Sequence, residues 1–538
     1  MQNRIWWRFF ARRSAICYFV LILLFFAGFL RVAVIARTDY AEVLKSHGRL
    51  KLEITNLRGT IYDCNMVPLT NRKTKIIAAV SPTKRAKDAL KTVLSDKEYT
   101  DLCERLDSSD KPVLCELPEE VVCDGIMCTT VFYDDEPVLS PHTIGYVNSD
   151  NKGISGIQAA YDDLLYSKNS AYFAYACDGL GNILSGVQGE IFNDTSAVAN
   201  GVVSTLDINI QNIIEETANP LTKGAVVVAE ADTLKIRGIV SRPNFDNLDI
   251  ANYLNDPSSP LFNRAINSYA VGSAFKPCVA AAAIENNLGN TKYTCIGNMQ
   301  IIDRLFNCHE RTGHGFMTLE YALANSCNTY FFNLALKTGG SGVYKMADSL
   351  HFGRKIKLCD GVYTANCTIP QKDKLQNEAH LANFSIGQGD FTASPVSMLT
   401  LYSAIANGGK YHMPSLVEGT YKEGTFTKYN SGYPTKAMNE ATAESLKKYL
   451  QTVITEGTGA AALPKTVTAA GKTATAQTGK FENGKEILSS WFCGFFPADK
   501  PKYIIIVFCE NSSLQTESCA EIFAKTADKI VSLSVDKY

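Results

Sequence analysis

A serine and a lysine three residues apart form the first pair in this chain whose types and spacing could do chemistry. Ser273 and Lys276 lie at the start of an alanine-rich segment, which we predict to be a helix over 274–287 ended by Gly289. On one helical turn both side chains share a face, so a desolvated lysine could take the serine's proton and leave a nucleophile. Amide groups at the helix N-terminus would stabilise an acyl oxyanion. By itself, this spacing is more typical of a capping serine beside a solvated lysine.

A second pair of polar residues follows in a segment predicted to lie between helices. Ser326 and Asn328 flank Cys327, and on a turn both side chains can face one cleft. The hydroxyl could then relay a proton while the amide donates to a substrate carbonyl. Serine and asparagine are also ordinary turn residues, so this motif is weak when taken alone.

A Gly-Lys-Thr run further along the chain contains Lys472 and Thr473, with Thr475 two residues beyond. The small residues around it would let a strand edge lie against an extended ligand, and the lysine and threonine could hold a carboxylate. The run is not a nucleotide-binding P-loop, because Thr466 stands where the Walker pattern requires glycine.

The elements that must position these residues begin after residue 200. Strands are predicted first, then a block of helices, then further strands and a terminal helix, which indicates an α+β fold or a mixed sheet covered by helices. The predicted strands are 202–206, 224–229, 235–240, 491–496 and 503–509, and the terminal helix is 519–531.

The composition excludes several broad classes. With 46% hydrophobic and 20% charged residues the chain can bury large cores, so disorder and coiled coil are excluded as its main architecture. The net charge of −1 gives no support for nucleic-acid binding. No CxxC, HExxH or HxH spacing occurs, so we expect no metal and no cofactor.

The first 38 residues contain no Asp or Glu and predict a membrane anchor. Arginines up to Arg13 precede an apolar run, so we predict a cytoplasmic tail over 1–13, a single transmembrane helix over 14–36 and an extracytoplasmic body. A cleaved signal peptide ending near Ala36 is the alternative. A change in the pattern of predicted elements at Gly201 predicts two domains in the body, over 37–200 and over 201–538.

The three motifs, taken in order, resemble the SxxK, SxN and KTG motifs of penicillin-binding proteins and serine β-lactamases. Two upstream stretches, 58–63 and 153–158, resemble the N-terminal module of class B penicillin-binding proteins. The resemblance implies a transpeptidase domain behind an elongated pedestal, and a membrane-anchored peptidoglycan D,D-transpeptidase. Other stretches similar to this family are 263–265, 313–315, 385–389, 405–409, 456–459 and 491–495.

The resemblance also implies catalytic roles. Ser273 would attack the carbonyl between two D-alanines of a stem peptide, and Lys276 would act as its base. Ser326 would pass the proton toward the leaving amine, and Asn328 would orient the substrate amide. A neighbouring stem peptide's amine would then resolve the acyl-enzyme.

The third motif would bind the substrate. Lys472 and Thr473 would hold its terminal carboxylate, and the N–H groups of Ser273 and Thr475 would form the oxyanion hole. The family usually has glycine where this chain has Ala474, which adds a Cβ beside the substrate strand.

The implied partners are peptidoglycan stem peptides, β-lactams as inhibitors, the cytoplasmic membrane and a glycosyltransferase of the division or elongation machinery. Three alternatives remain open. A bifunctional penicillin-binding protein would need a glycosyltransferase domain, and about 165 residues before Gly201 leave too little room for one plus a pedestal. A β-lactamase-like hydrolase shares the motifs, but an anchor and a pedestal are not its usual plan. A catalytically silent scaffold would keep the fold without being acylated by penicillin.

A disulfide between Cys295 and Cys308 is a further prediction. The residues between them read as a hairpin over 298–306, and its ends would meet within disulfide reach. The alternative is that both thiols are unpaired. His314, between two glycines, is predicted to be a turn residue and not a base.

Overall fold

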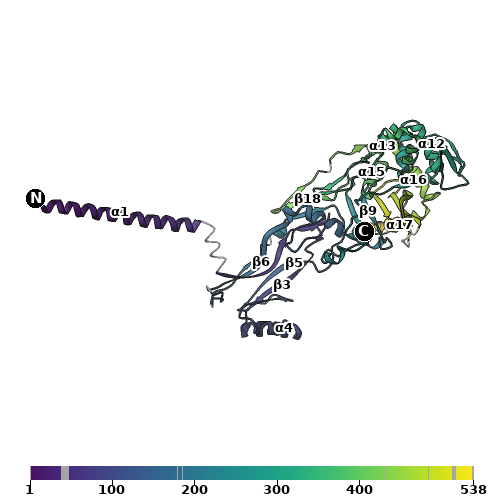
Figure 1. The fold of residues 1–538 in the computed structure, drawn as a ribbon. Helices are drawn as coiled ribbons and strands as arrows, with labels where there is room; N and C mark the ends of the chain where they lie inside the picture. The colour runs from purple at the N-terminus through teal and green to yellow at the C-terminus, as the bar shows by residue number, and fades with distance from the viewer. Residues whose placement is uncertain are drawn as a thin grey trace. The chain divides into compact units, whose positions relative to one another are not determined.

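The protein is described by a computed structural model that covers residues 2–37, 48–178, 180–184, 186–194, 196–430, 432–482, 484–511 and 517–535 (Figure 1). The described chain forms two compact units. The first comprises 1–57, 74–132 and 168–194, and the second comprises 58–73, 133–167 and 195–538.

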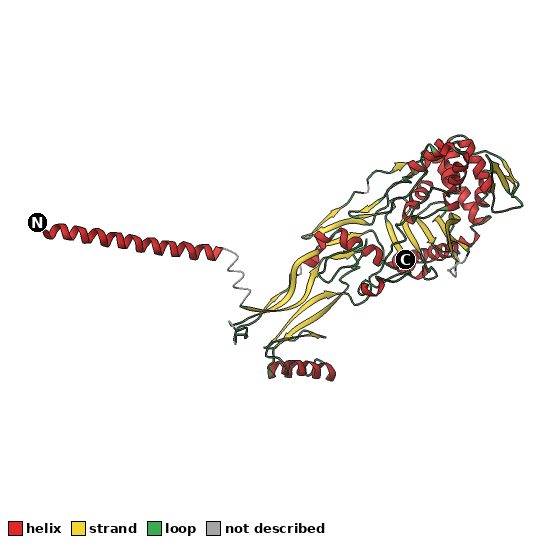
Figure 2. Cartoon of the chain, in the orientation of Figure 1, coloured by secondary structure: helices red, strands yellow, loops and turns green. Residues whose placement is uncertain are grey.

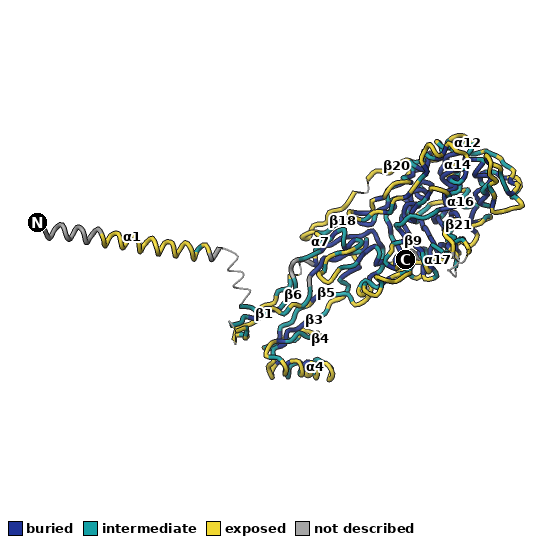
Figure 3. Tube along the Cα trace, viewed as in Figure 1, coloured by how far each residue is buried: buried dark blue, intermediate teal, exposed yellow. Residues whose placement is uncertain are grey.

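Helix α1 (Gln2–Arg37) contains the predicted membrane span. Its stretch Arg13–Val34 is the one described helix that is long and apolar enough to cross a membrane. Large apolar side chains along it are exposed, Phe25 by 75%, and nearly all of Arg13–Val34 is coloured as exposed in Figure 3. Such a surface is stable in a lipid environment and not in water.

The first unit contains most of a three-stranded sheet in the order β4-β3-β5. Two helices, α3 (Lys84–Leu90) and α4 (Asp96–Asp107), pack their apolar side chains onto it. Ser95 caps α4 in a capping box with Glu98. The strands are β3 (Lys73–Val80), β4 (Val113–Leu117) and β5 (Ile126–Tyr133), and a separate sheet joins β1 (Arg49–Arg58), β6 (Tyr166–Ala176) and β7 (Glu190–Phe192).

The second unit is built on a five-stranded sheet in the order β10-β9-β23-β22-β21, antiparallel throughout. The strands predicted over 224–229 and 235–240 pair with each other as an antiparallel hairpin, with Val226 opposite Val240. The strands are β9 (Gly224–Glu230), β10 (Ile236–Arg242), β21 (Ala470–Glu482), β22 (Lys485–Phe496) and β23 (Tyr503–Cys509).

Both faces of this sheet are covered by helices. Val226 and Val228 belong to the core beneath α9 (Ile208–Thr217) and α17 (Cys519–Val535), whereas Val227 faces the core of α10 (Lys276–Glu285) and α15 (Pro395–Ala406). Because both faces are buried, β9 is a continuous apolar run (Figure 3).

The predicted α+β class is therefore confirmed, with one refinement. Parallel pairing occurs not in the five-stranded sheet but in a smaller sheet, β19-β18-β8-β2, where β2 (Thr60–Tyr62) runs parallel to β8 (Gly201–Ser204). The other two strands are β18 (Val417–Lys422) and β19 (Thr425–Lys428).

The helices between β10 and β21 form the block that Figure 2 shows in red at one end of the second unit. They are α11 (Leu319–Ala324), α12 (Asn328–Thr338), α13 (Gly340–Ser349), α14 (Glu378–Ser385) and α16 (Glu440–Thr455), together with α10 and α15. Shorter helices and strands are α5 (Pro141–Ile144), α6 (Gly156–Ala160), α7 (Asp162–Leu165), α8 (Ser196–Ala199), β15 (Lys357–Cys359), β16 (Val362–Tyr363), β17 (Lys410–Tyr411) and β20 (Thr435–Lys436).

The helix predicted over 274–287 is shorter than expected. A 3₁₀ turn, η2 (Gly272–Phe275), precedes α10, which begins at Lys276 with Pro277 in its first turn. The helix ends before Asn287, which adopts the left-handed conformation (φ 62°) that the sequence assigned to Gly289. Ser273 therefore lies on the 3₁₀ turn and not within the α-helix.

The hairpin predicted between the two cysteines is confirmed, but the disulfide is wrong. Strands β12 (Asn298–Ile301) and β13 (Arg304–Asn307) pair as expected, whereas Cys295 and Cys308 are free thiols. The chain turns at Gly297 (φ 90°), and β11 (Tyr293–Cys295) pairs instead with β14 (Gly315–Met317), which places Cys295 opposite Gly315.

Candidate active site

The turn that carries Ser273 is held by its neighbouring glycine. Gly272 has φ 66°, and its N–H donates to the Gly387 carbonyl at 2.9 Å. A Cβ on Gly272 would lie 2.8 Å from the Thr475 carbonyl oxygen of β21, closer than a carbon can approach. The glycine thus lets the partly exposed Ser273 lie against the edge strand.

Two buried aromatic side chains fix the same turn through its carbonyl groups. Tyr402 of α15 donates its hydroxyl to the Ala274 carbonyl at 3.1 Å, and Trp491 Nε1 of β22 donates to the Ala270 carbonyl at 3.0 Å. Sequence reasoning assigned neither role. Trp491 lay in a family-like stretch, but nothing in the sequence around Tyr402 indicates this contact.

Lys276 is completely buried, and its amine is held by the second motif. Its Nζ donates to the Ser326 carbonyl at 2.6 Å, to Ser326 Oγ at 3.1 Å and to Asn328 Oδ1 at 2.7 Å. Burial lowers the pKa of Lys276 to about 7. In the described part of the chain, no hydrogen bond joins Lys276 Nζ to Ser273 Oγ. The lysine amine is therefore bonded to the second motif and not to the serine.

Ser326 and Asn328 lie between α11 and α12, as predicted. Ser326 adopts φ 54°, a strained value for a residue with a Cβ, and Asn328 is the first residue of α12. The Ala324 carbonyl at the end of α11 accepts the Thr458 N–H at 3.0 Å. This contact ties the second motif to the segment that precedes the third.

Lys472 of the third motif is also completely buried. Its Nζ donates to the Thr473 carbonyl at 3.0 Å, to Thr473 Oγ1 at 3.2 Å and to Thr458 Oγ1 at 3.4 Å. Burial, with the nearby charge of Lys276, holds the pKa of Lys472 well below its ordinary value. Thr458 lies in a family-like stretch, but the sequence did not assign it to the site.

The third motif lies on the edge strand β21, the last in the sheet order. Thr473 is half-buried and Thr475 is exposed, whereas Ala474 between them is only 6% exposed and pairs with Trp491. A strand at a sheet edge can pair with an extended peptide, and this one passes directly beside the Ser273 turn.

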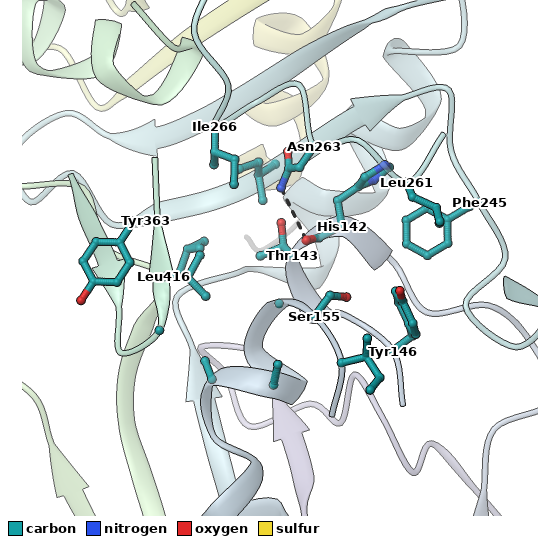
Figure 4. A pocket seen from close by; sticks show the side chains of 17 residues that line it. His142, Thr143, Tyr146, Ser155, Phe245, Leu261, Asn263, Ile266, Tyr363 and Leu416 are labelled. Carbon is teal, nitrogen blue, oxygen red and sulfur yellow. Dashed lines mark hydrogen bonds between the residues drawn. The ribbon is translucent and has the colours of Figure 1, made fainter. Parts of the chain in front are cut away.

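A cavity of about 440 Å³ lies elsewhere in the second unit, and none of the predicted site residues lines it (Figure 4). His142 and Phe245 meet edge to face in its wall with ring centroids 4.8 Å apart, and Asn263 donates to the His142 carbonyl. His142 Nε2 lies 2.6 Å from the Pro260 carbonyl, and burial lowers the pKa of this histidine to about 4.

The chain is similar in sequence to one protein family and to several characterised proteins. Residues 224–529 match the family described as "Penicillin binding protein transpeptidase domain". The chain is 28% identical over 390 residues to Stage V sporulation protein D of Bacillus subtilis, covering 69% of this chain and 58% of that protein. It is 27% identical over 424 residues to Peptidoglycan D,D-transpeptidase MrdA of Acinetobacter baumannii, covering 69% and 62%. It thus spans less than two thirds of the length of either relative.

A solved structure shows the same fold. Penicillin binding protein 3 from Mycobacterium tuberculosis, complexed with aztreonam, has a TM-score of 0.66 and 20% identity to this chain. The match covers 90% of this chain and 97% of that one.

Proposed function

The chain belongs to the class B penicillin-binding protein family, and we propose that it is a membrane-anchored peptidoglycan D,D-transpeptidase. The observation that carries this proposal is the buried amine of Lys276, which lies between Ser326 and Asn328 on the helical turn that follows Ser273. Acylation of Ser273 by a β-lactam tests it directly.

In the acylation step, Ser273 Oγ attacks the carbonyl carbon between the two D-alanines of a stem peptide. Lys276 is the base that removes the hydroxyl proton, because burial favours its neutral form. Ser326, in contact with the Lys276 amine, passes the proton to the nitrogen of the departing D-alanine. A second stem peptide's amine then attacks the ester, which completes the cross-link and frees Ser273.

The substrate lies along β21. The terminal carboxylate of the substrate lies among Lys472, Thr473 and Thr458. The negative charge of this carboxylate would favour the protonated form of Lys472 when the substrate binds. The N–H groups of Ser273 and Thr475 form the oxyanion hole, consistent with the close approach of their two backbones at Gly272. Asn328 orients the substrate amide.

The remaining proposals concern location and organisation. Residues 1–13 form a cytoplasmic tail, 14–36 span the membrane with the N-terminus inside, 37–200 are the pedestal and 201–538 are the transpeptidase domain. The arginines that precede the span support this orientation. A glycosyltransferase of the division or elongation machinery supplies the glycan strands whose stem peptides are cross-linked.

Replacing Lys472 with Ala is expected to lower the efficiency of β-lactam acylation by about 10- to 100-fold, the value of one charge-assisted hydrogen bond to the ligand carboxylate. Stopped-flow measurement with a chromogenic cephalosporin gives this efficiency. Lys485→Ala, an exposed lysine on the neighbouring strand β22, is the matched control and should be unchanged. Equal efficiency of Lys472→Ala and the wild-type protein would contradict the carboxylate site.

The acylation rate is expected to rise with pH through about 7, the pKa to which burial brings Lys276. Below this value the amine is protonated and cannot accept the serine's proton. Negative charge on the sulfurs of Cys327 and Cys308 acts in the opposite direction to burial and raises the pKa of this amine. Rates of labelling by fluorescent penicillin, with circular dichroism to confirm folding, measure this profile. A rate that is constant across about two pH units on either side would exclude Lys276 as the base.

A further inference from the structure

Three cysteines and one histidine converge beside the second motif. The donor atoms of Cys295, Cys308, His314 and Cys327 all lie within 4.8 Å of one another, and the cysteines are buried while the histidine is half-buried. They come from four separate places: the end of β11, the residue after β13, the turn before β14 and the residue before α12.

The separations of these atoms match the edges of a metal-centred tetrahedron. Cys295 Sγ and Cys308 Sγ lie 3.6 and 3.5 Å from His314 Nδ1, and Cys308 Sγ lies 4.0 Å from Cys327 Sγ. A tetrahedral Zn²⁺ with ordinary bond lengths places sulfur and nitrogen about 3.6 Å apart and two sulfurs about 3.8 Å apart. We propose that these four residues bind one Zn²⁺.

Hydrogen-bond donors on neighbouring residues contact two of the three sulfurs in the cluster. The backbone N–H groups of Asn328 and Thr329, at the N-terminus of α12, donate to Cys308 Sγ, and the Thr329 hydroxyl donates to Cys295 Sγ at 3.1 Å. Hydrogen bonds of this kind orient and stabilise metal ligands.

The donor set selects the metal and its role. Three soft thiolates and an imidazole favour Zn²⁺ over Mg²⁺ or Ca²⁺, which prefer oxygen ligands. Four protein ligands fill a tetrahedral site and leave no open position, so the ion would be structural and would not activate water. The expectation of no metal rested on HExxH, HxH and CxxC spacings, which these residues do not use.

The ion would also act as a positioning device for the active site. Cys327 lies between Ser326 and Asn328, whose side chains hold the Lys276 amine. A metal bond to Cys327 would hold Ser326 in its left-handed conformation (φ 54°). This consequence, unlike metal binding itself, rests on the proposed transpeptidase function.

Metal analysis of the full chain, purified in detergent without chelators from zinc-supplemented cells, tests the site. We expect about one Zn²⁺ per chain in the wild-type protein, and at least about a tenfold loss in Cys308→Ser and in His314→Ala. His380→Ala is the matched control, because His380 is an exposed histidine on α14 that is not part of the cluster. It should keep the zinc. A zinc-free wild-type protein, or equal zinc in all variants, would overturn the proposal.

A measurement on the wild-type protein covers the possibility that the ligand variants fail to fold. Chelation should increase the reactivity of Cys295, Cys308 and Cys327 toward iodoacetamide, measured by mass spectrometry, while that of Cys278 of α10, which is buried outside the cluster, stays unchanged. Adding Co²⁺ should restore protection and produce the visible bands of a tetrahedral thiolate complex. Alkylation that is independent of chelator, or a Cys295–Cys308 disulfide, would contradict the site.

Ser273→Ala separates this proposal from the proposed function. It should lose penicillin labelling and keep its zinc, whereas Cys308→Ser should lose zinc and label more slowly. Zinc in a wild-type protein that penicillin does not label would refute the transpeptidase and leave the metal site standing. Penicillin labelling of a wild-type protein that contains no zinc would refute the metal site and leave the transpeptidase standing.

Discussion

Fluorescent penicillin is expected to label the full chain covalently, and Ser273→Ala is expected to abolish this label. The β-lactam carbonyl takes the place of the carbonyl between the two D-alanines, and its ring opens when Ser273 Oγ attacks. No partial activity is expected from the variant, because the Gly272 turn brings this one hydroxyl against β21. In-gel fluorescence and peptide mass spectrometry of the labelled serine measure the effect.

Ser445→Ala is the matched control for this experiment. Ser445 is a half-buried serine on α16 whose hydroxyl donates to the Ala441 carbonyl of its own helix, so its loss should leave labelling unchanged. Normal labelling of Ser273→Ala would end the acyl-enzyme mechanism. A wild-type protein that is never labelled would identify a silent scaffold, and rapid turnover of nitrocefin would identify a hydrolase.

Replacing Lys276 with Ala is expected to slow acylation by about 10²–10⁴-fold, the usual contribution of a general base. The variant also leaves Ser326 Oγ and Asn328 Oδ1 without their shared donor. Lys276→Arg is the more informative change, because a guanidinium keeps a positive charge but cannot lose its proton at accessible pH. It should be as slow as the alanine variant if Lys276 acts as a base.

Lys337→Ala, an exposed lysine near the end of α12, controls for the general effect of removing a lysine. Single-turnover labelling rates, with thermal unfolding to confirm the fold, compare the variants. A Lys276→Arg variant that acylates at the wild-type rate would mean that the lysine acts by charge alone.

Much of this protein followed from local sequence. The apolar run of α1, the continuous apolar strand β9 and the β12–β13 hairpin are consequences of residue type and spacing within a few neighbours. The seven candidate site residues were identified from short motifs in a known order. Each motif alone is common in proteins. The resemblance of the three motifs to a known family, more than their spacing, therefore distinguished these residues from ordinary serines, lysines and threonines.

The tertiary structure decided which of these residues meet. It placed the Lys276 amine against Ser326 and Asn328, about fifty residues along the chain, and brought Thr458, Tyr402 and Gly387 to the site. Such contacts depend on how distant segments pack, which local spacing does not encode.

The cysteines show most clearly the difference between what local sequence predicts and what tertiary packing decides. The hairpin alone suggested that Cys295 and Cys308 would bond to each other, but both are free thiols, and Cys295 pairs in β11 with Gly315 of β14. Cys295, Cys308, His314 and Cys327 are irregularly spaced in sequence and form one cluster only because two short sheets and the start of α12 pack together. Strand pairing between separate segments determined that cluster, and no local pattern specified it.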